Sequence, residues 1–310
     1  MPDMRVSMSK ILPGLAALLL LSAASGGAHA QGASATPRWQ PFVSVTPWGQ
    51  DRADLDGGGS FRASGAIVRA GAAGPIGGGH RAGLTLSYDH TDYDFSPPTA
   101  FGAVAPWGDV RRIGISVPVI LRGSTEWSYL VTPSVDYVME DDAKSSEAVI
   151  YGAVLGAAKR FGPDQMLGLG IGAFDRLEEV RVFPFILVDW RLTDRLRLAN
   201  PLEAGPTGGA GLELSYQAGG DWMLGGGAAY RSVRFRLDQT GPFPNGIGEQ
   251  RGLAGFVHAG RPLGGGFRFD LYAGAIFGGE LRVENANGDK LISRDFDPAP
   301  FVGATIAVRL

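Results

Sequence analysis

The chain has 310 residues, a formal net charge of −3 and no cysteine. Without cysteine there are no disulfides, thiolate nucleophiles or cysteine metal ligands, and the slightly acidic balance provides no basic surface for nucleic acid. Hydrophobic residues make up 45% of the chain. Beyond residue 31, however, no apolar run approaches the roughly 18 consecutive residues that indicate a membrane-spanning helix, so we exclude a helical membrane protein.

The first thirty residues have the three parts of a secretory signal peptide. Arg5 and Lys10 are basic, residues 11–22 are apolar, and a small-residue stretch ends in an A-x-A site at Ala30. We expect cleavage after Ala30 and export from the cytoplasm. The alternative, an uncleaved anchor, is less favoured because the apolar run is shorter than the roughly 20 residues of a spanning helix.

In the rest of the chain, apolar and polar residues alternate with the period of two that is typical of β-strands. In residues 267–283, FRFDLYAGAIFGGELRV, the odd positions are mainly apolar and the even positions carry the charges. Successive side chains of a strand point to opposite faces, so one face is oily and the other charged. A soluble β-sandwich also alternates, but its strands commonly have about 5–6 residues. Strands this long, along nearly the whole chain, favour a barrel with its apolar face toward lipid.

The pattern predicts an all-β fold, an antiparallel up-and-down transmembrane β-barrel over residues 41–310, after a short periplasmic segment at 31–40. The predicted strands are 41–48, 61–71, 80–92, 110–121, 127–138, 147–160, 165–175, 181–191, 195–201, 209–218, 221–237, 250–260, 267–283 and 300–310. These are 14 strands. Twelve is the alternative, because 41–48 and 195–201 contain or end in proline. If the C-terminus is periplasmic, the long connectors face outward and the short turns inward, as in bacterial outer-membrane barrels.

The last ten residues, FVGATIAVRL, predict a final amphipathic strand. Val302, Ala304, Ile306, Val308 and Leu310 share its apolar face. Such a strand resembles the C-terminal assembly signal of outer-membrane proteins, although those usually end in Phe. We expect the barrel-assembly machinery to recognise it, and outer-membrane lipids to surround the finished barrel.

Several segments resemble an uncharacterised family of bacterial outer-membrane β-barrel proteins, known only as a domain of unknown function. They are FPFILVDWRLTDRLRL (183–198), GLELSYQAGGDWMLGGGAAYRSVRFRLD (211–238), GIGEQRG (246–252), FRFDLYAGAIFGGELRVENANGD (267–289) and DPAPFVGATIAVRL (297–310). The likeness covers roughly residues 180–310. It implies the barrel fold and the outer-membrane location, and it implies no substrate, cofactor or catalytic residue.

The alternation also predicts which charged residues line the lumen. They are Arg112, Asp189, Arg191, Glu213, Arg234, Arg236, Arg268, Asp270, Glu280 and Arg282. Such charges either line a water-filled channel and tune its selectivity, or form Arg–carboxylate pairs that fill the interior. Fourteen strands enclose a wider bore than about eight, which side chains can just fill. We therefore favour a passive, porin-like channel for an unidentified small solute.

Two other functions remain open. The barrel could be non-conducting and serve structure or surface interaction through loops 93–109, 238–249 and 284–299. It could also be a lipid-active enzyme, with His90 beside Asp89 or Asp92 as the acid–base candidate. The chain lacks G-x-S-x-G and H-E-x-x-H motifs, and a histidine among loop carboxylates is the simpler interpretation of His90. We therefore expect no catalytic residue, no cofactor and no metal.

Overall fold

The computed structural model describes residues 38–96, 100–201, 207 and 210–310. The predicted signal peptide (1–30) and most of the predicted periplasmic segment (31–40) lie outside the described residues. Within them, the chain is almost entirely β-strand, with one short 3-10 turn, η3 (Ser145–Glu147). None of the described helical residues belongs to a helix long and apolar enough to cross a bilayer.

Sixteen strand segments follow one another along the chain. They are β1 (Gln40–Asp54), β2 (Ser60–Gly77), β3 (His80–Ser96), β4 (Val110–Ser116), β5 (Val119–Arg122), β6 (Trp127–Glu140), β7 (Val149–Gly162), β8 (Gln165–Arg176), β9 (Val180–Arg191), β10 (Leu196–Ala199), β11 (Gly211–Gln217), β12 (Met223–Arg236), β13 (Ile247–Gly264), β14 (Phe267–Glu284), β15 (Lys290–Phe296) and β16 (Ala299–Arg309).

Two pairs of segments are interrupted strands. Both β4 and β5 lie between β3 and β6, and both β15 and β16 pair with β14. Pro118 and Pro298 fall in the two interruptions, where the missing backbone N–H of proline costs no ladder hydrogen bond. The sixteen segments therefore form fourteen strands.

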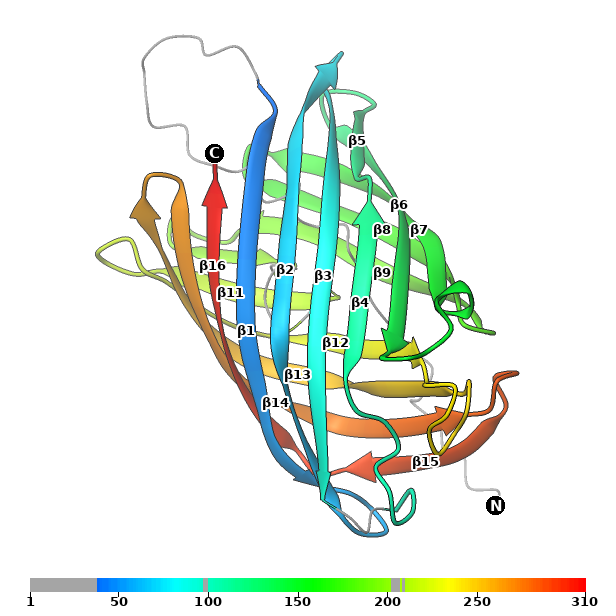
Figure 1. Cartoon of the computed structure of the whole chain (residues 1–310). Coiled ribbons are helices and arrows are strands. Elements are labelled where there is room, and N and C mark those ends of the chain that lie inside the picture. The colour runs from blue at the N-terminus through cyan, green and yellow to red at the C-terminus, as the bar shows by residue number, and fades with distance from the viewer. Residues whose placement is uncertain (1–37, 97–99, 202–206, 208–209) are drawn as a thin grey trace, which may run out of the picture.

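The sheet closes on itself through β1 and β16, which pair antiparallel from Phe42–Arg309 to Gln50–Phe301 (Figure 1). The predicted all-β antiparallel barrel of fourteen strands is confirmed. The two predicted segments that contain or end in proline, 41–48 and 195–201, are both strands. In β1, Pro47 lies in register opposite Ala66 of β2, and β10 ends at Ala199, before Pro201.

The two ends of the barrel differ in the length of their connections. At one end, which we call the inner end, short turns such as 78–79, 163–164 and 265–266 join the strands, and the C-terminal strand ends there. At the other, which we call the outer end, the connections include 97–109 and 237–246. This is the predicted asymmetry, and it is typical of bacterial outer-membrane barrels.

The outer wall carries a belt of exposed apolar side chains from nearly every strand. They include Leu84, Leu86, Tyr88, Ile113, Ile115, Leu155, Leu167, Leu169, Ile171, Val182, Ile186, Leu212, Leu214, Leu253, Val257, Leu271, Val302 and Ile306. A soluble monomer rarely exposes an apolar patch larger than a few hundred Å². A belt that surrounds a closed barrel suits the hydrocarbon region of a bilayer.

Glycines on the interior face of β8 let neighbouring groups approach the sheet closely. A Cβ added to Gly168 would lie 2.6 Å from the Cα of Ala158 in β7. At Gly170, a Cβ would collide with the ring of Phe185, which lies over that glycine. Side chains at these two positions would force the backbone or a buried ring to move.

We expect Gly168→Ala to destabilise the refolded barrel by about 1–3 kcal/mol, because the new methyl group meets backbone that no rotamer change can move aside. The matched control is Gly49→Ala in β1, where an added Cβ would find nothing within 4 Å. Urea-induced unfolding in lipid vesicles, followed by tryptophan fluorescence, measures both. Equal unfolding midpoints for the two variants would contradict the close approach of β7 and β8.

Candidate functional site

The outer end of the barrel interior is filled by aromatic rings. Trp107 lies at the centre, with its ring centroid 5.4 Å from that of Phe95 and 5.3 Å from that of Phe235, both in edge-on geometry. Phe101 and Trp107 belong to the connection between β3 and β4, so this loop folds into the barrel mouth. Each such ring pair contributes about 0.5–1.5 kcal/mol beyond the burial of its area.

We call this cluster the outer plug. Its members are Phe61, Tyr93, Phe95, Phe101, Trp107, Phe235 and Phe296. All seven side chains are at most 7% exposed. Within the described residues, the plug thus fills the outer end of the interior with packed apolar side chains.

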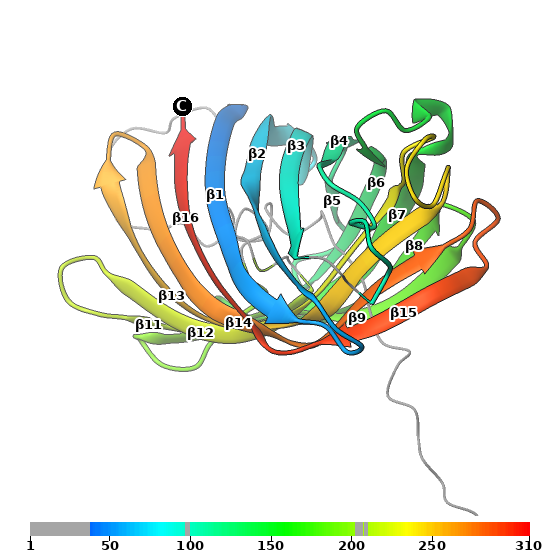
Figure 2. The ribbon, with the colours of Figure 1, turned by 60° about the horizontal axis from the view of Figure 1, so that its bottom comes forward.

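The plug depends on an inward bend of β12. Beyond Ala229, which pairs with Gly211, β12 runs past the end of β11. Its last residue, Arg236, instead pairs in parallel with Met139 at the end of β6. Both views show the outer end of β12 close to β6 (Figure 1, Figure 2). Near its outer end, β12 therefore lies beside β6 and is not paired with β7–β11. The outer end of the barrel is for this reason narrower than its middle.

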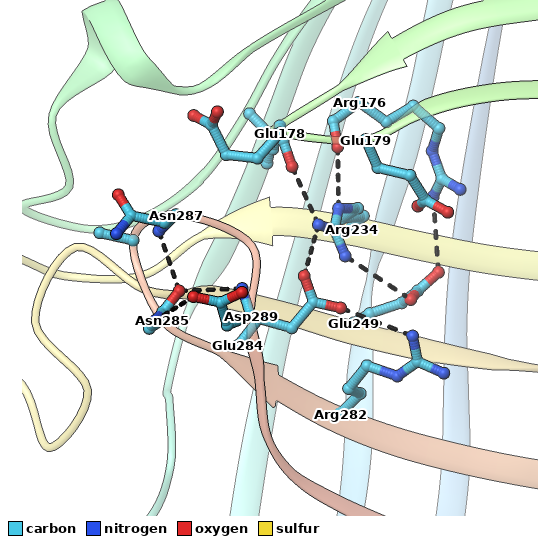
Figure 3. A network of polar contacts seen from close by, with 12 residues as sticks. Arg176, Glu178, Glu179, Arg234, Glu249, Arg282, Glu284, Asn285, Asn287 and Asp289 are labelled. Atoms are coloured by element: carbon cyan, nitrogen blue, oxygen red, sulfur yellow. Dashed lines mark hydrogen bonds and ion pairs between the residues drawn. The ribbon is translucent and has the colours of Figure 1, made fainter.

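The outer ends of β13 and β14 follow β12, because β12 pairs with β13 and β13 with β14 up to their outer ends, and we call these three the inward-bent strands. Their face opposite the plug carries charges. Arg234, next to Phe235 and therefore on the other face, donates from Nη2 to Glu284 Oε2 at 2.6 Å and from Nε to the carbonyl of Arg176 at 2.8 Å (Figure 3). Glu249 Oε1 lies 3.7 Å from Arg176 Nη2. These four side chains are at most 7% exposed.

We call this set the ionic seam: Arg176, Arg181, Arg234, Glu249, Arg282 and Glu284. Arg176 and Arg181 project from the interior faces of β8 and β9, because their strand neighbours Leu169, Ile171 and Val182 are exposed to the outside. The seam thus joins the β8–β9 wall to the inward-bent strands. Unlike the plug, it is held by charged groups on both sides.

The inner end of the interior holds a cavity of about 470 Å³. We call it the inner vestibule. It reaches the turn between β13 and β14, where Gly264 and Gly266 line it. The charged residues that line it are Arg81, Arg197, Glu213, Arg268, Asp270 and Arg309.

A buried histidine on the interior face of β13 lies next to the vestibule. His258 Nε2 is 2.7 Å from Asp270 Oδ1, and its Nδ1 is 3.1 Å from Glu213 Oε1. The imidazole stacks on Tyr272, with centroids 4.8 Å apart and planes at 16°. Both ring nitrogens carry hydrogen only in the imidazolium form, which is the form that can donate to both carboxylates. Arg268 also donates to Asp270, at 2.7 Å, so both carboxylates are already occupied.

A ladder of charges crosses the wall between β2 and β6. Asp89 forms ion pairs with Arg69 and, at 3.5 Å, with Arg112. Arg112 in turn donates from Nε to Asp136 Oδ1 at 2.9 Å. These pairs join neighbouring strands on the interior face and rigidify that wall.

The ten predicted lumen residues fall into two groups. Arg112, Asp189, Glu213, Arg268 and Asp270 lie on interior faces, and Arg191 lies at the inner rim, half-exposed and 3.2 Å from Asp164. The other four lie on the face that points away from the outer plug: Arg234, Arg236, Glu280 and Arg282. At the outer ends of β12 and β14 the interior therefore has a second, apolar face that the alternation does not predict.

Two physical causes explain this apolar face. In β12 the alternation is regular, but the apolar side chain of Phe235 faces the outer plug instead of lipid. In β14 a bulge reverses the faces. Phe277 pairs with Leu253 and Glu280 with Arg251, so β14 has one extra residue, at the positive φ of Gly278 (55°). Beyond it, Leu281 is buried in the interior and Glu280 points away.

Sequence reasoning missed several interior residues. His258 lies in segment 250–260, whose alternation is ambiguous in the sequence, although it shares its parity with the interior residues Ala254 and Phe256. That parity is the signal that could have found it. Nothing in the sequence marks Trp107, because it lies in a loop and its burial depends on the fold.

His90 lies on β3 near the outer end. Asp89 points to the opposite face and pairs with Arg69, while Asp92 is exposed on the same face as His90. Among the described residues, no hydrogen bond joins His90 to either carboxylate. Within the same described ranges, no group of three or more His, Asp or Glu residues could hold a metal ion. The expectation of no catalytic residue stays a prediction.

These features define the chain as a β-barrel of the outer-membrane type, closed at its outer end. No protein-family model matches it, and no curated protein matches it in sequence. Among solved structures it is similar to an outer-membrane channel from Pseudomonas putida F1, at 9% identity and a TM-score of 0.41, over 90% of this chain and 97% of that one.

A second similar structure is the P. putida toluene transporter TodX, at 9% identity and a TM-score of 0.41, over 89% of this chain and 91% of that one. A third is Pseudomonas aeruginosa OpdK with vanillate, at 13% identity and a TM-score of 0.33, over 88% and 98%. The barrel fold that the resemblance implies is confirmed by the closed sheet of the structure itself. At these identities and TM-scores, the similarity carries no inference about solutes or residues.

We expect Arg234→Gln to destabilise the barrel by about 3–5 kcal/mol, because it leaves Glu284 and Glu249 buried without their full compensation. Arg62→Gln is the matched control, since Arg62 pairs with Asp94 at the surface, with side chains 64% and 53% exposed. Its loss changes stability by less than about 1 kcal/mol. Urea unfolding in vesicles measures both variants, and similar losses in the two would refute a buried seam.

Proposed function

We propose that the protein is an outer-membrane channel for a small solute, and that the described conformation is its closed state. The single observation that carries this proposal is the division of the interior. A polar vestibule occupies the inner end, and the outer plug fills the outer end. In this proposal the solute crosses passively, no chemical step takes place, and the exported chain is inserted into the outer membrane by the assembly machinery.

The contacts around the plug favour opening without unfolding. The outer end of β12 shares one ladder pair with β6, Arg236–Met139, and Arg236 donates from Nε to the carbonyl of Glu147 at 2.9 Å, whereas β12 pairs with β13 along its whole length. The inward-bent segment therefore can move as a hairpin. The ionic seam has charged groups on both faces, and water can solvate these groups when the faces separate. An apolar interface would lack that compensation.

The second candidate, a non-conducting barrel that serves structure or surface interaction, is favoured by the tightness of the plug. Phe235 and Leu281 have no exposed surface at all. If the strands never separate, only the outer connections remain available to partners. Conductance decides between the two functions.

The test is single-channel recording of the refolded mature protein, residues 31–310, in planar bilayers. We expect brief, rare openings for the wild type. Phe235→Ala removes a ring from the centre of the plug, so we expect more frequent or larger unitary currents from this variant. Trp107→Ala is expected to act in the same direction.

The matched control is Phe277→Ala, which removes the same side chain from the outer wall, where Phe277 is 48% exposed. It is expected to leave the current unchanged. Heat-dependent gel mobility verifies that each barrel is folded. Folded plug variants that carry no current would contradict the channel proposal and support the non-conducting barrel.

A further inference from the structure

We propose that the inner vestibule binds a small organic anion, a carboxylate on a compact apolar body. This inference rests on the proposed function and deepens it by naming the class of solute. The vestibule volume of about 470 Å³ is in the range of small-molecule sites, about 300–1,000 Å³. Binding at this site can be measured without any current.

The charges that reach the vestibule are mainly positive. Four arginines and two carboxylates line it: Arg81, Arg197, Arg268 and Arg309, with Glu213 and Asp270. Glu213 and Asp270 are turned toward His258, and their side chains are only 8% and 2% exposed. The side chain of Arg268, by contrast, is 33% exposed. The two carboxylates are thus largely buried at the cavity wall, and the arginines are the more exposed charges.

Pairing removes only part of this positive charge. Arg268 is paired with Asp270, and Arg197 donates to Asp189 at 2.7 Å. In the described part of the chain, no ion pair joins Arg81 or Arg309 to a carboxylate. Two cationic side chains therefore remain for a ligand.

Arg81 carries a further sign of a missing acceptor. Its Nε is buried and has no hydrogen-bond partner among the described residues. Arginine presents its donors in a planar fork that matches a carboxylate or a phosphate oxygen pair. An anion in the vestibule would supply the acceptor that the protein itself does not provide.

The rest of the wall distinguishes an organic anion from an inorganic one. Phe42 and Met223 line the same cavity from interior strand faces, and Ala73 and Ala307 add smaller apolar surfaces. A bare oxyanion makes no use of these groups. A ligand with an apolar body buries them from water, which adds to its binding free energy.

The experiment is isothermal titration calorimetry of the refolded mature protein, residues 31–310, in a nonionic detergent. The probes are benzoate, its neutral isostere benzamide, and inorganic phosphate. We expect benzoate to bind at least about tenfold more tightly than benzamide, the difference that one charge-assisted hydrogen bond supplies. Benzoate is also expected to bind more tightly than phosphate. Equal affinity for benzoate and benzamide would contradict the proposal that the site recognises a negative charge. Tighter binding of phosphate than of benzoate would contradict the proposal that the ligand has an apolar body.

The variants locate the site. Arg81→Gln combined with Arg309→Gln is expected to weaken benzoate binding at least about tenfold. Arg62→Gln, at the outer end, is expected to leave it unchanged. Equal binding by the wild type and the double variant would place benzoate elsewhere and reject the vestibule. The comparison of benzoate with benzamide on the wild type needs no variant, so it decides the chemistry even if the double variant does not fold.

The binding and current measurements can contradict the two proposals independently of each other. Selective benzoate binding by a barrel that never conducts, even with plug variants, would reject the channel and keep the anion site. Unitary currents without benzoate binding would keep the channel and reject the anion site.

Discussion

A closed sheet of fourteen strands encloses more space than a single layer of inward side chains can fill, and the structure depends on how that space is used. Closure through β1 and β16 satisfies the backbone of both terminal strands, so neither of them is a sheet edge. It also sets the width of the bore. Protein interiors are close-packed, so a bore this wide has to hold water or further protein. This barrel has packed protein at its outer end and a cavity at its inner end.

At the outer end, the further protein is part of the barrel wall itself. The inward bend of β12–β14 gives the ends of these strands two interior faces. One face adds Phe235 to the plug, and the other carries Arg234 into the ionic seam. Buried ion pairs contribute little net stability compared with apolar contacts of the same volume, because desolvation offsets their attraction. In a channel, a seam of this kind would define the closed state and would still let the two charged faces separate, because water can solvate both of them.

At the inner end, polar side chains leave room for water, and their arrangement decides which charge the water-filled space presents. His258 forms hydrogen bonds with Glu213 and Asp270, so the two carboxylates at the cavity wall are already paired. The same neutralisation occurs in the ladder of Arg69, Asp89, Arg112 and Asp136. The vestibule differs from these clusters because its arginines outnumber its available carboxylates.

Much of the barrel could be predicted from the sequence, because the strand period of two is local. Alternation identified the strands and separated their faces, so outward residues such as Ile113 and Leu214 were placed correctly. Alternation could not show which face is interior where the outer ends of β12–β14 bend into the barrel. Phe235 is apolar and buried in the plug, where alternation alone predicts lipid contact. The bulge at Gly278 reversed the faces of β14. Nothing in the sequence distinguishes Gly278 from the other glycines of that strand, so the bulge could not be predicted.

By itself, therefore, the sequence determined the class of fold, the number of strands, the unequal connections at the two ends and the apolar outer wall, since each follows from patterns over a few neighbouring residues. Only the tertiary structure decided that β12 turns inward to meet β6, that Trp107 enters the barrel, and that the carboxylates of the vestibule are occupied by His258. These features join residues far apart in the chain. They depend on competition for the same interior volume, which no local pattern records.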